Sequence, residues 1–133
     1  MLETIEISTS KEKFFLEYLI LKKPVVDTIL SKINGEKTTL SEKPMQVLAQ
    51  LLYYTDLFKD LNENDKWAHV FSKKVKGEIC SKLSMKEHHL NIYLSQLRGI
   101  KILEGKNIRN IFAVNVSDSH SLTFKFKING LAE

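Results

Sequence analysis

The chain has 133 residues, 43% of them hydrophobic and 27% charged, with five glycines and two prolines, which is typical of one folded domain and not of a disordered or fibrous chain. Its most apolar run, Phe14 to Leu21, contains Glu17 and is far shorter than the ~20 residues needed to cross a bilayer, and the N-terminus lacks a signal-peptide pattern. The single cysteine, Cys80, excludes an intrachain disulfide and favours a reducing, cytoplasmic setting.

The net charge of +4 is distributed unevenly along the chain. Between Phe71 and Asn110 nine lysines and arginines face three acidic residues, so this segment carries +6 and the rest of the chain carries −2. Concentrated positive charge favours a polyanionic partner, of which nucleic acid is the first candidate. A basic face that is merely solvated is the alternative.

The N-terminal part predicts a strand followed by helix. Thr4 to Thr9 alternates and is rich in β-branched residues, as a short strand would be. A helix is expected from about Ser10, with an apolar face made of Phe14, Phe15, Tyr18 and Leu19. Pro24 interrupts it, and the chain continues either as a second helix or as a kinked extension that ends at Asn34-Gly35. Residues 1–39 would thus form a strand and a helical extension packed on the core.

The next helix has a clear start at Ser41, which is a suitable N-cap, and Pro44 is still within its first turn. Leu40 and Met45 are placed for a hydrophobic staple. The apolar stripe then extends to about Leu57 through Met45, Leu48, Leu51, Leu52 and Tyr54 or Thr55. The polar run from Lys59 to Lys66 predicts a loop between helices.

Two helices separated by a three-residue break are expected between Ser72 and Gly99. The first turns Val75, Ile79, Cys80 and Leu83 inward, and Gly99 ends the second. The segment Ile100–Leu103, a turn at Glu104–Asn107 and Asn110–Val116 then predict a two-stranded hairpin. Leu122 to Ile128 alternates strictly and predicts a last strand. Residues 40–133 would form the main part of one compact domain.

The second of these helices has two distinct faces. On a wheel of about 100° per residue, Leu90, Tyr93, Leu94 and Leu97 share one side. The opposite side carries His88, Asn91, Ile92 and Ser95. A mixture of amide, imidazole, hydroxyl and aliphatic groups suits a DNA major groove, where asparagine can pair with adenine, histidine can contact guanine or phosphate, and isoleucine can meet a thymine methyl.

The segment from Phe71 to Leu103 resembles the core of winged helix-turn-helix DNA-binding proteins, in particular bacterial and phage transcription regulators and plasmid or phage replication initiators. The resemblance is carried by the turn Leu83-Ser84-Met85, by Leu90, by the run Tyr93-Leu-Ser-Gln-Leu97 and by Gly99-Ile-Lys-Ile-Leu103. It extends from Leu40 to Val116. The chain departs from the family at Lys86, where a capping hydroxyl is usual, so Ser84 is an alternative helix start.

The resemblance implies an α+β, mainly helical fold: a winged helix-turn-helix core with the N-terminal strand and helical extension and the C-terminal strand added. It also implies a recognition helix from about Lys86 to Arg98, and a wing that carries Lys106 and Arg109 to phosphates or the minor groove. His88, Asn91, Ile92 and Ser95 would read bases. The residues expected to contact phosphates are Lys73, Lys74, Lys76, Lys86, Arg98, Lys101, Lys106 and Arg109.

The sequence therefore predicts a sequence-specific double-stranded DNA-binding protein, a transcription regulator or replication-associated factor in the cytoplasm of a bacterium or phage-infected cell. A winged-helix protein-interaction module without specific DNA binding, an adaptor in a polymerase, replisome or phage assembly, is the alternative. A homodimer and a protein partner are both left open, and no membrane partner or cofactor is expected. No metal is expected either, because His88 and His89 are adjacent and helical metal pairs need i, i+4 spacing. No pattern in the sequence supports an enzyme.

Overall fold

The structure is a computed structural model that describes residues 9–114. Within that range the fold is mainly helical, with one small antiparallel sheet of two strands. The elements are the helices α1 (Lys11–Asn34), α2 (Glu42–Leu57), α3 (Glu63–Val70), α4 (Lys73–Leu83) and α5 (Glu87–Gly99), the strands β1 (Leu103–Glu104) and β2 (Asn107–Ile108), and a 3-10 turn η1 (Asn110–Phe112). The predicted strand Thr4–Thr9 lies outside the described residues except for Thr9, which is not in a strand, and the predicted strand Leu122–Ile128 lies outside them entirely.

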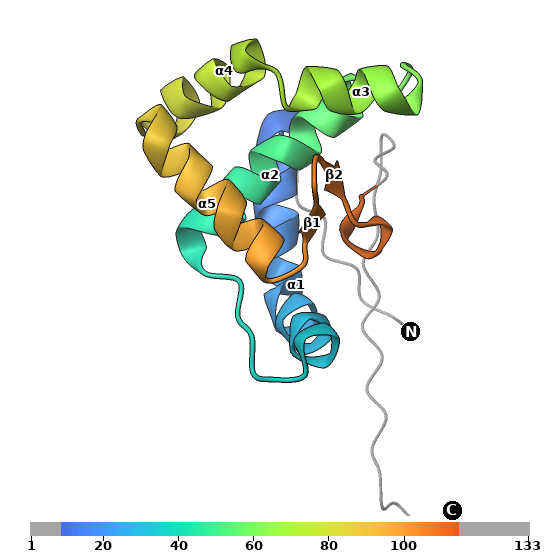
Figure 1. Ribbon diagram of the computed structural model, residues 1–133, viewed down its shortest axis with the longest axis vertical. Helices are drawn as coiled ribbons and strands as arrows, with labels where there is room; N and C mark the ends of the chain where they lie inside the picture. Colours follow the sequence, from blue (N-terminus) through green and yellow to red (C-terminus); the bar gives the residue numbers. More distant parts are fainter. Residues whose placement is uncertain (1–8, 115–133) are drawn as a thin grey trace, which may run out of the picture.

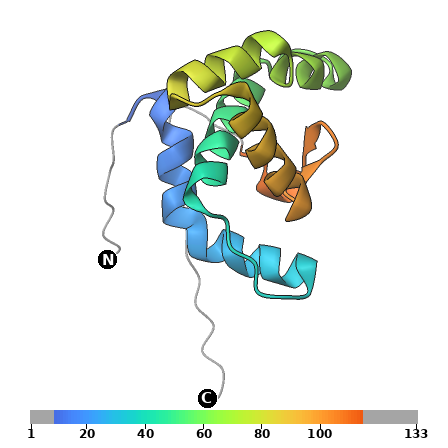
Figure 2. The ribbon, with the colours of Figure 1, turned by 60° about the vertical axis from the view of Figure 1, so that its left-hand side comes forward.

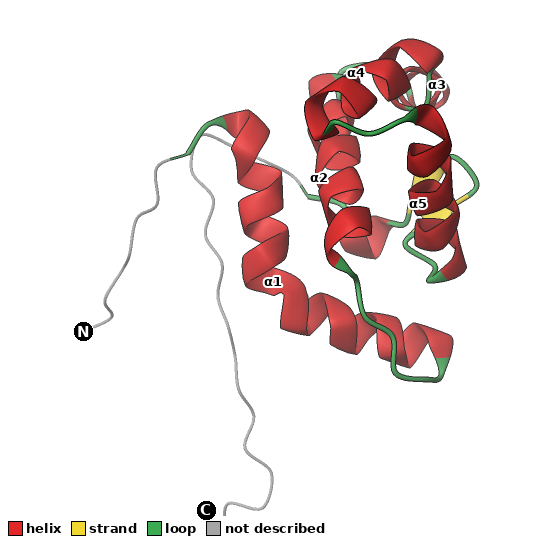
Figure 3. Ribbon diagram, turned by 90° about the vertical axis from the view of Figure 1, so that its left-hand side faces the viewer, coloured by secondary structure: helices red, strands yellow, loops and turns green. Residues whose placement is uncertain are grey.

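Helix α2 is the centre of the molecule. It is packed between α1 on one side and α5 on the other (Figures 1 and 3). Since both flanks are covered, α2 buries more than the predicted stripe, adding Val47 and Ala49 to the expected leucines. Ser41 occupies its N-cap position as expected, although its side chain makes no capping hydrogen bond. Leu40 and Met45 are both buried there.

Helix α1 is one bent helix, which settles the alternative left open at Pro24. It begins after Ser10, whose hydroxyl oxygen accepts a hydrogen bond from the Lys13 amide, and it ends at Gly35, which has a left-handed φ of 70°. Pro24 lies inside it, and the helix bends around α2 (Figure 3). Because proline removes one backbone hydrogen bond and crowds the preceding turn, it allows this bend. Phe15 and Leu19 before it and Leu30 after it can therefore all reach the core.

The prediction of a loop from Lys59 to Lys66 was wrong in part, because α3 begins at Glu63. The side-chain oxygen of Asn62 accepts a hydrogen bond from the Asp65 amide and caps the helix. Glu63 then accepts hydrogen bonds from Lys66 and from the indole N–H of Trp67. This helix is short and polar on most of its surface, so apolar periodicity gave no signal for it.

The predicted hairpin is present but shorter than expected. Leu103 pairs with Ile108 and Glu104 with Asn107, joined by a two-residue turn at Gly105 and Lys106. Gly105 has a φ of 58°, which a glycine adopts without strain at this place in a tight turn. The predicted second strand, Asn110–Val116, was wrong at its start, since Asn110–Phe112 forms the 3-10 turn η1 and buries Phe112.

Candidate nucleic-acid interface

Helices α4 and α5 are joined by a tight, well-defined turn. The hydroxyl oxygen of Ser72 accepts a hydrogen bond from the Val75 amide and starts α4, while Val75 and Ile79 anchor it in the core. At its end Ser84 adopts a left-handed φ of 52°, and the amide of Met85 donates to the Cys80 carbonyl. This bonding pattern closes a helix and turns the chain sharply.

The start of α5 is set by the same turn. Ser84 closes α4 and does not cap α5, so the alternative start at Ser84 was wrong. Lys86 occupies the N-cap position, with no side-chain hydrogen bond, and α5 begins at Glu87. Methionine at position 85 is half-buried and packs against the core between the two helices. The helix therefore begins where the prediction of a helix from about Lys86 placed it, and the two faces assigned on the helical wheel apply to α5.

Burial along α5 follows the predicted wheel. Leu90, Leu94 and Leu97 are buried on α2, and Tyr93 is half-buried beside them. His88, Asn91, Ile92 and Ser95 are all exposed. Ile92 retains half of its surface, 50%, which is high for an isoleucine on a folded domain. The ring of His88 lies beside that of His89, with centroids 4.0 Å apart.

Gln96 also belongs to this surface, although it was not among the predicted base-reading residues. A shallow hollow on the outer side of α5 is lined by Asn91, Ile92, Ser95 and Gln96. Gln96 lies four residues after Ile92 and is exposed, so the helical period offered a signal for it. Glutamine, like asparagine, can present a donor and an acceptor together to one adenine edge.

The end of α5 is fixed from two sides. The amide of Ile102 donates to the Leu97 carbonyl, and Lys101 adopts a left-handed φ of 70°. Asn34, at the end of α1, donates from its side-chain nitrogen to the Ile100 carbonyl at 3.0 Å. Gly99 is the last helical residue, as predicted, but Lys101 makes the turn. The left-handed residue aims the chain directly into β1.

The hairpin is tied to α5 by Arg98. Its Nε donates to the Gly105 carbonyl at 2.8 Å. The ribbon view shows the hairpin beside α5 (Figure 2). Arg109 forms an ion pair with Glu104 at 3.3 Å within the hairpin. Both arginines, expected to contact phosphates, therefore already have partners within the chain. Lys106 is exposed at the turn itself.

The lysines of α4 differ in their solvent exposure and in their contacts within the chain. Lys73 and Lys74 are exposed in its first turn, and Lys76 is half-buried. Lys82 forms an ion pair with Glu12 at 2.9 Å and lies over the rings of Tyr53 and Tyr54. Burial lowers the pKa of Lys82, but the hydrogen bonds to Glu12 and Tyr54 outweigh that effect and raise it. Lys82 thus joins α4 to α1 and α2.

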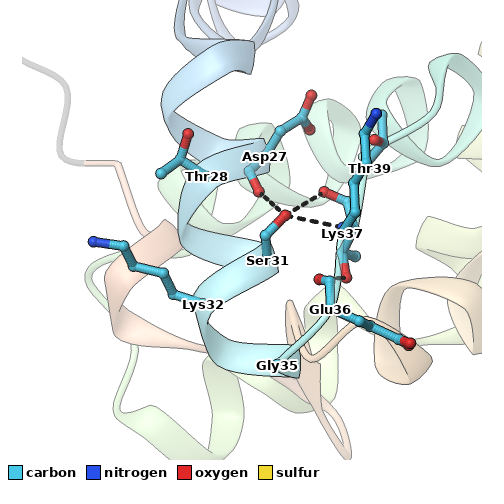
Figure 4. A pocket seen from close by; sticks show the side chains of 9 residues that line it. Asp27, Thr28, Ser31, Lys32, Gly35, Glu36, Lys37 and Thr39 are labelled. Carbon is cyan, nitrogen blue, oxygen red and sulfur yellow. Dashed lines mark hydrogen bonds between the residues drawn. The ribbon is translucent and has the colours of Figure 1, made fainter.

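A second hollow lies between the C-terminal half of α1 and the loop that leads to α2 (Figure 4). The Ser31 hydroxyl donates to the Asp27 carbonyl and accepts from the Thr38 amide at 2.9 Å. The Asp27 carboxylate accepts from the Leu40 amide at 2.8 Å and pairs with Lys23. These contacts hold the loop against α1 and deliver Leu40 to the start of α2, so they serve the fold.

Other candidate chemistry has little support in the described part of the chain. Cys80 is half-buried, and burial followed by the charge of Glu87 raises the pKa of its thiol, which opposes thiolate formation. Between residues 9 and 114 no three His, Cys, Asp or Glu side chains are grouped as metal ligands. In the same range, no helix combines the length and apolar character that spanning a membrane requires.

Comparisons of the chain with models of protein families, with curated proteins and with solved structures find no match.

Proposed function

We propose that the protein binds double-stranded DNA with α5 in the major groove, as a sequence-specific regulator or replication-associated factor. In this proposal α2, α4 and α5 act as a helix-turn-helix and the β1–β2 hairpin as a short wing. The observation that carries it is the outer face of α5, where Asn91, Ile92 and Ser95 are exposed on a helix that follows the tight turn after α4. An exposed helix face with polar groups and one aliphatic group matches what base edges present.

The positive charge beside this face supports the proposal. Lys73 and Lys74 lie at the start of α4, Lys86 at the start of α5, and Lys101 and Lys106 beyond its end, all exposed. Such lysines neutralise phosphates while the helix between them reads bases. With Lys76 they make six lysine candidates. Arg98 and Arg109 are better assigned to holding the hairpin, because each is bonded within the chain.

A second candidate function is a protein-interaction module that uses the same face. Its specific support is Ile92, since a half-exposed isoleucine at the centre of a surface is also suited to a protein partner. The two functions differ in their response to salt, because neutralised phosphates release counterions and an apolar protein interface does not.

The first experiment is the fluorescence anisotropy of a labelled random-sequence duplex titrated with the protein between about 50 and 300 mM salt. We expect the logarithm of the affinity to fall linearly with the logarithm of the salt concentration. If three to six of the lysines engage, the slope is about −3 to −5. Changing Lys74 to Gln should reduce its magnitude by about 0.9.

Lys13→Gln is the matched control, because Lys13 is exposed on α1 and belongs to no proposed contact surface. It should leave the slope unchanged. Absence of binding at the lowest salt concentration would contradict the DNA proposal and favour the protein-interaction module.

Changing Lys101 to Gly should move stability and DNA affinity in opposite directions. A left-handed conformation costs an L-residue roughly 1 to 2 kcal/mol, and glycine at this position avoids that cost. The greater conformational freedom of glycine in the unfolded chain offsets part of the stabilisation. We expect the free energy of unfolding to rise by about 0.5 to 1 kcal/mol, measured in urea, while duplex affinity falls with the lost charge. Lys106→Gly is the control, since the φ of Lys106 is not positive: affinity should fall without a gain in stability.

A further inference from the structure

The shallow hollow on the outer side of α5 has a lining of definite chemistry. Two of its four residues, Asn91 and Gln96, carry a side-chain amide, and the other two are Ile92 and Ser95. Asn91 and Ser95 are four residues apart, as are Ile92 and Gln96, so each pair lies on adjacent turns of the helix. All four are exposed. The hollow is therefore open to a partner and presents two amides, one hydroxyl and one aliphatic group.

The amides and the isoleucine favour A·T base pairs when the hollow faces the major groove. A side-chain amide bonds through its acceptor to the N6 amino group of adenine and through its donor to N7. The C5 methyl of thymine is the aliphatic group on the major-groove edge, and Ile92 offers it an apolar contact. The hydroxyl of Ser95 bonds to either kind of base pair, so it does not oppose this choice.

The residue types that read G·C pairs are missing from the lining of the hollow. Guanine is most often read by arginine or lysine, and cytosine by aspartate or glutamate. The chain has only two arginines, and both are held within it, Arg98 by the Gly105 carbonyl and Arg109 by Glu104. Helix α5 contains no lysine, and its one acidic residue, Glu87, lies in its first turn. The hollow thus lacks the charged groups that select guanine or cytosine.

The hollow is long enough for two to three base pairs. Four residues of α-helix rise about 6 Å, which is close to two steps of about 3.4 Å between successive base pairs. His88 is four residues before Ile92 and does not line the hollow, and its ring lies beside that of His89. His88 would therefore meet a neighbouring base pair.

We propose that the hollow on α5 receives two to three successive A·T base pairs, with a thymine methyl against Ile92 and adenine bonded to Asn91 and Gln96. This inference rests on the proposed DNA binding and adds the class of sequence that the protein prefers. Lys86 at the start of α5 and Lys101 beyond its end are exposed, and they supply positive charge for the phosphates on either side of these base pairs.

The test removes single groups from the DNA. A preferred duplex is first selected from a random library, and we expect a core of at least two successive A·T pairs. In one copy the core thymines are replaced by deoxyuridine, which lacks the C5 methyl, and in another the core adenines are replaced by 7-deazaadenine, which lacks the N7 acceptor. Fluorescence anisotropy in one buffer should show a loss of about fourfold for the contacted methyl and about two- to 12-fold for each lost hydrogen bond.

Protein variants assign each loss to a side chain. For Ile92→Ala, the thymine and deoxyuridine duplexes should bind equally, because the methyl no longer has its contact. For the Asn91→Ala, Gln96→Ala double variant, the adenine and 7-deazaadenine duplexes should bind equally. Lys74→Gln is the matched control, since an exposed lysine at the start of α4 would contact phosphates only. It should weaken all three duplexes by one factor and keep both ratios.

A selection that enriches G·C pairs or no sequence at all would overturn the inference, as would equal wild-type affinity for the three duplexes. Losses that persist in Ile92→Ala and in the amide double variant would also overturn it, because other residues would then read the methyl and N7. Binding of random duplex separates this inference from the proposed function. If random duplex binds with the expected salt dependence while the base replacements have no effect, only the inference fails. If no duplex binds at the lowest salt concentration, the proposed function fails and the inference fails with it.

Discussion

Changing Leu90 to Ala is expected to lower the free energy of unfolding by about 3 kcal/mol, within the range of 2 to 5 kcal/mol found for buried leucines. Leu90 is fully buried, in the second turn of α5 where the helix meets α2. Losing its isobutyl group removes apolar burial and leaves a cavity that a packed core closes only in part. Chemical denaturation in urea, followed by circular dichroism, measures the loss.

Ile92→Ala is the matched control for this prediction. It shortens an aliphatic side chain two residues further along the same helix, but Ile92 is half-exposed and so has less packing to lose. We expect a loss below about 0.5 to 1 kcal/mol. Equal losses for the two variants would mean that α5 is rotated about its axis relative to the structure, and the outer face would then need to be redefined.

The faces of α5 were predictable because their signal is local. Apolar residues at helical spacing fix which side is buried, and no distant contact is needed to find Leu90, Leu94 and Leu97. The helix starts near Ser10 and Ser72 and the helix end at Asn34-Gly35 were predictable for the same reason, since a helix end depends on a few neighbouring residues. Because this spacing was read correctly, all four predicted base-reading residues are exposed on α5.

The parts that could not be predicted depend on contacts between distant residues or on weak local signals. The side chain of Asn34 donates a hydrogen bond to the Ile100 carbonyl at the end of α5, 66 residues away in the sequence. No sequence pattern near Asn34 predicts that bond. Ser84 and Lys101 adopt left-handed conformations, which sequence patterns assign to glycine. The helix end was therefore predicted at Gly99, and the turn at Lys101 was not predicted. Arg98 looked like a phosphate contact, because its bond to Gly105 exists only once the hairpin is folded.

The same distinction separates residues that build the proposed interface from those that would read DNA. Asn34, Arg98 and the left-handed Lys101 backbone hold α5 and the hairpin in one arrangement. Asn91, Ile92 and Ser95 project from that frame and are not needed for its packing, since all three are exposed. Changing them should therefore affect recognition with little effect on stability.

The Asn91→Ala, Ser95→Ala double variant is expected to lose affinity for a preferred DNA site while keeping its affinity for random duplex. An asparagine bonded to adenine at two positions contributes about 1 to 3 kcal/mol of discrimination. The expected loss at the preferred site is therefore about five- to 150-fold. The preferred site would first be selected from a random library, and both affinities would be measured by fluorescence anisotropy in one buffer.

Lys74→Gln is the contrasting variant, because an exposed lysine at the start of α4 would contact phosphates only. It should weaken preferred and random duplexes by the same factor, whereas the double variant should change only their ratio. An unchanged ratio for Asn91 and Ser95, together with a response to Lys74, would contradict base reading and leave a phosphate-only architectural binder. If neither variant alters DNA affinity but the double variant loses a protein partner in a pulldown, the outer face of α5 is a protein-interaction surface, and Ile92 would be the next residue to change.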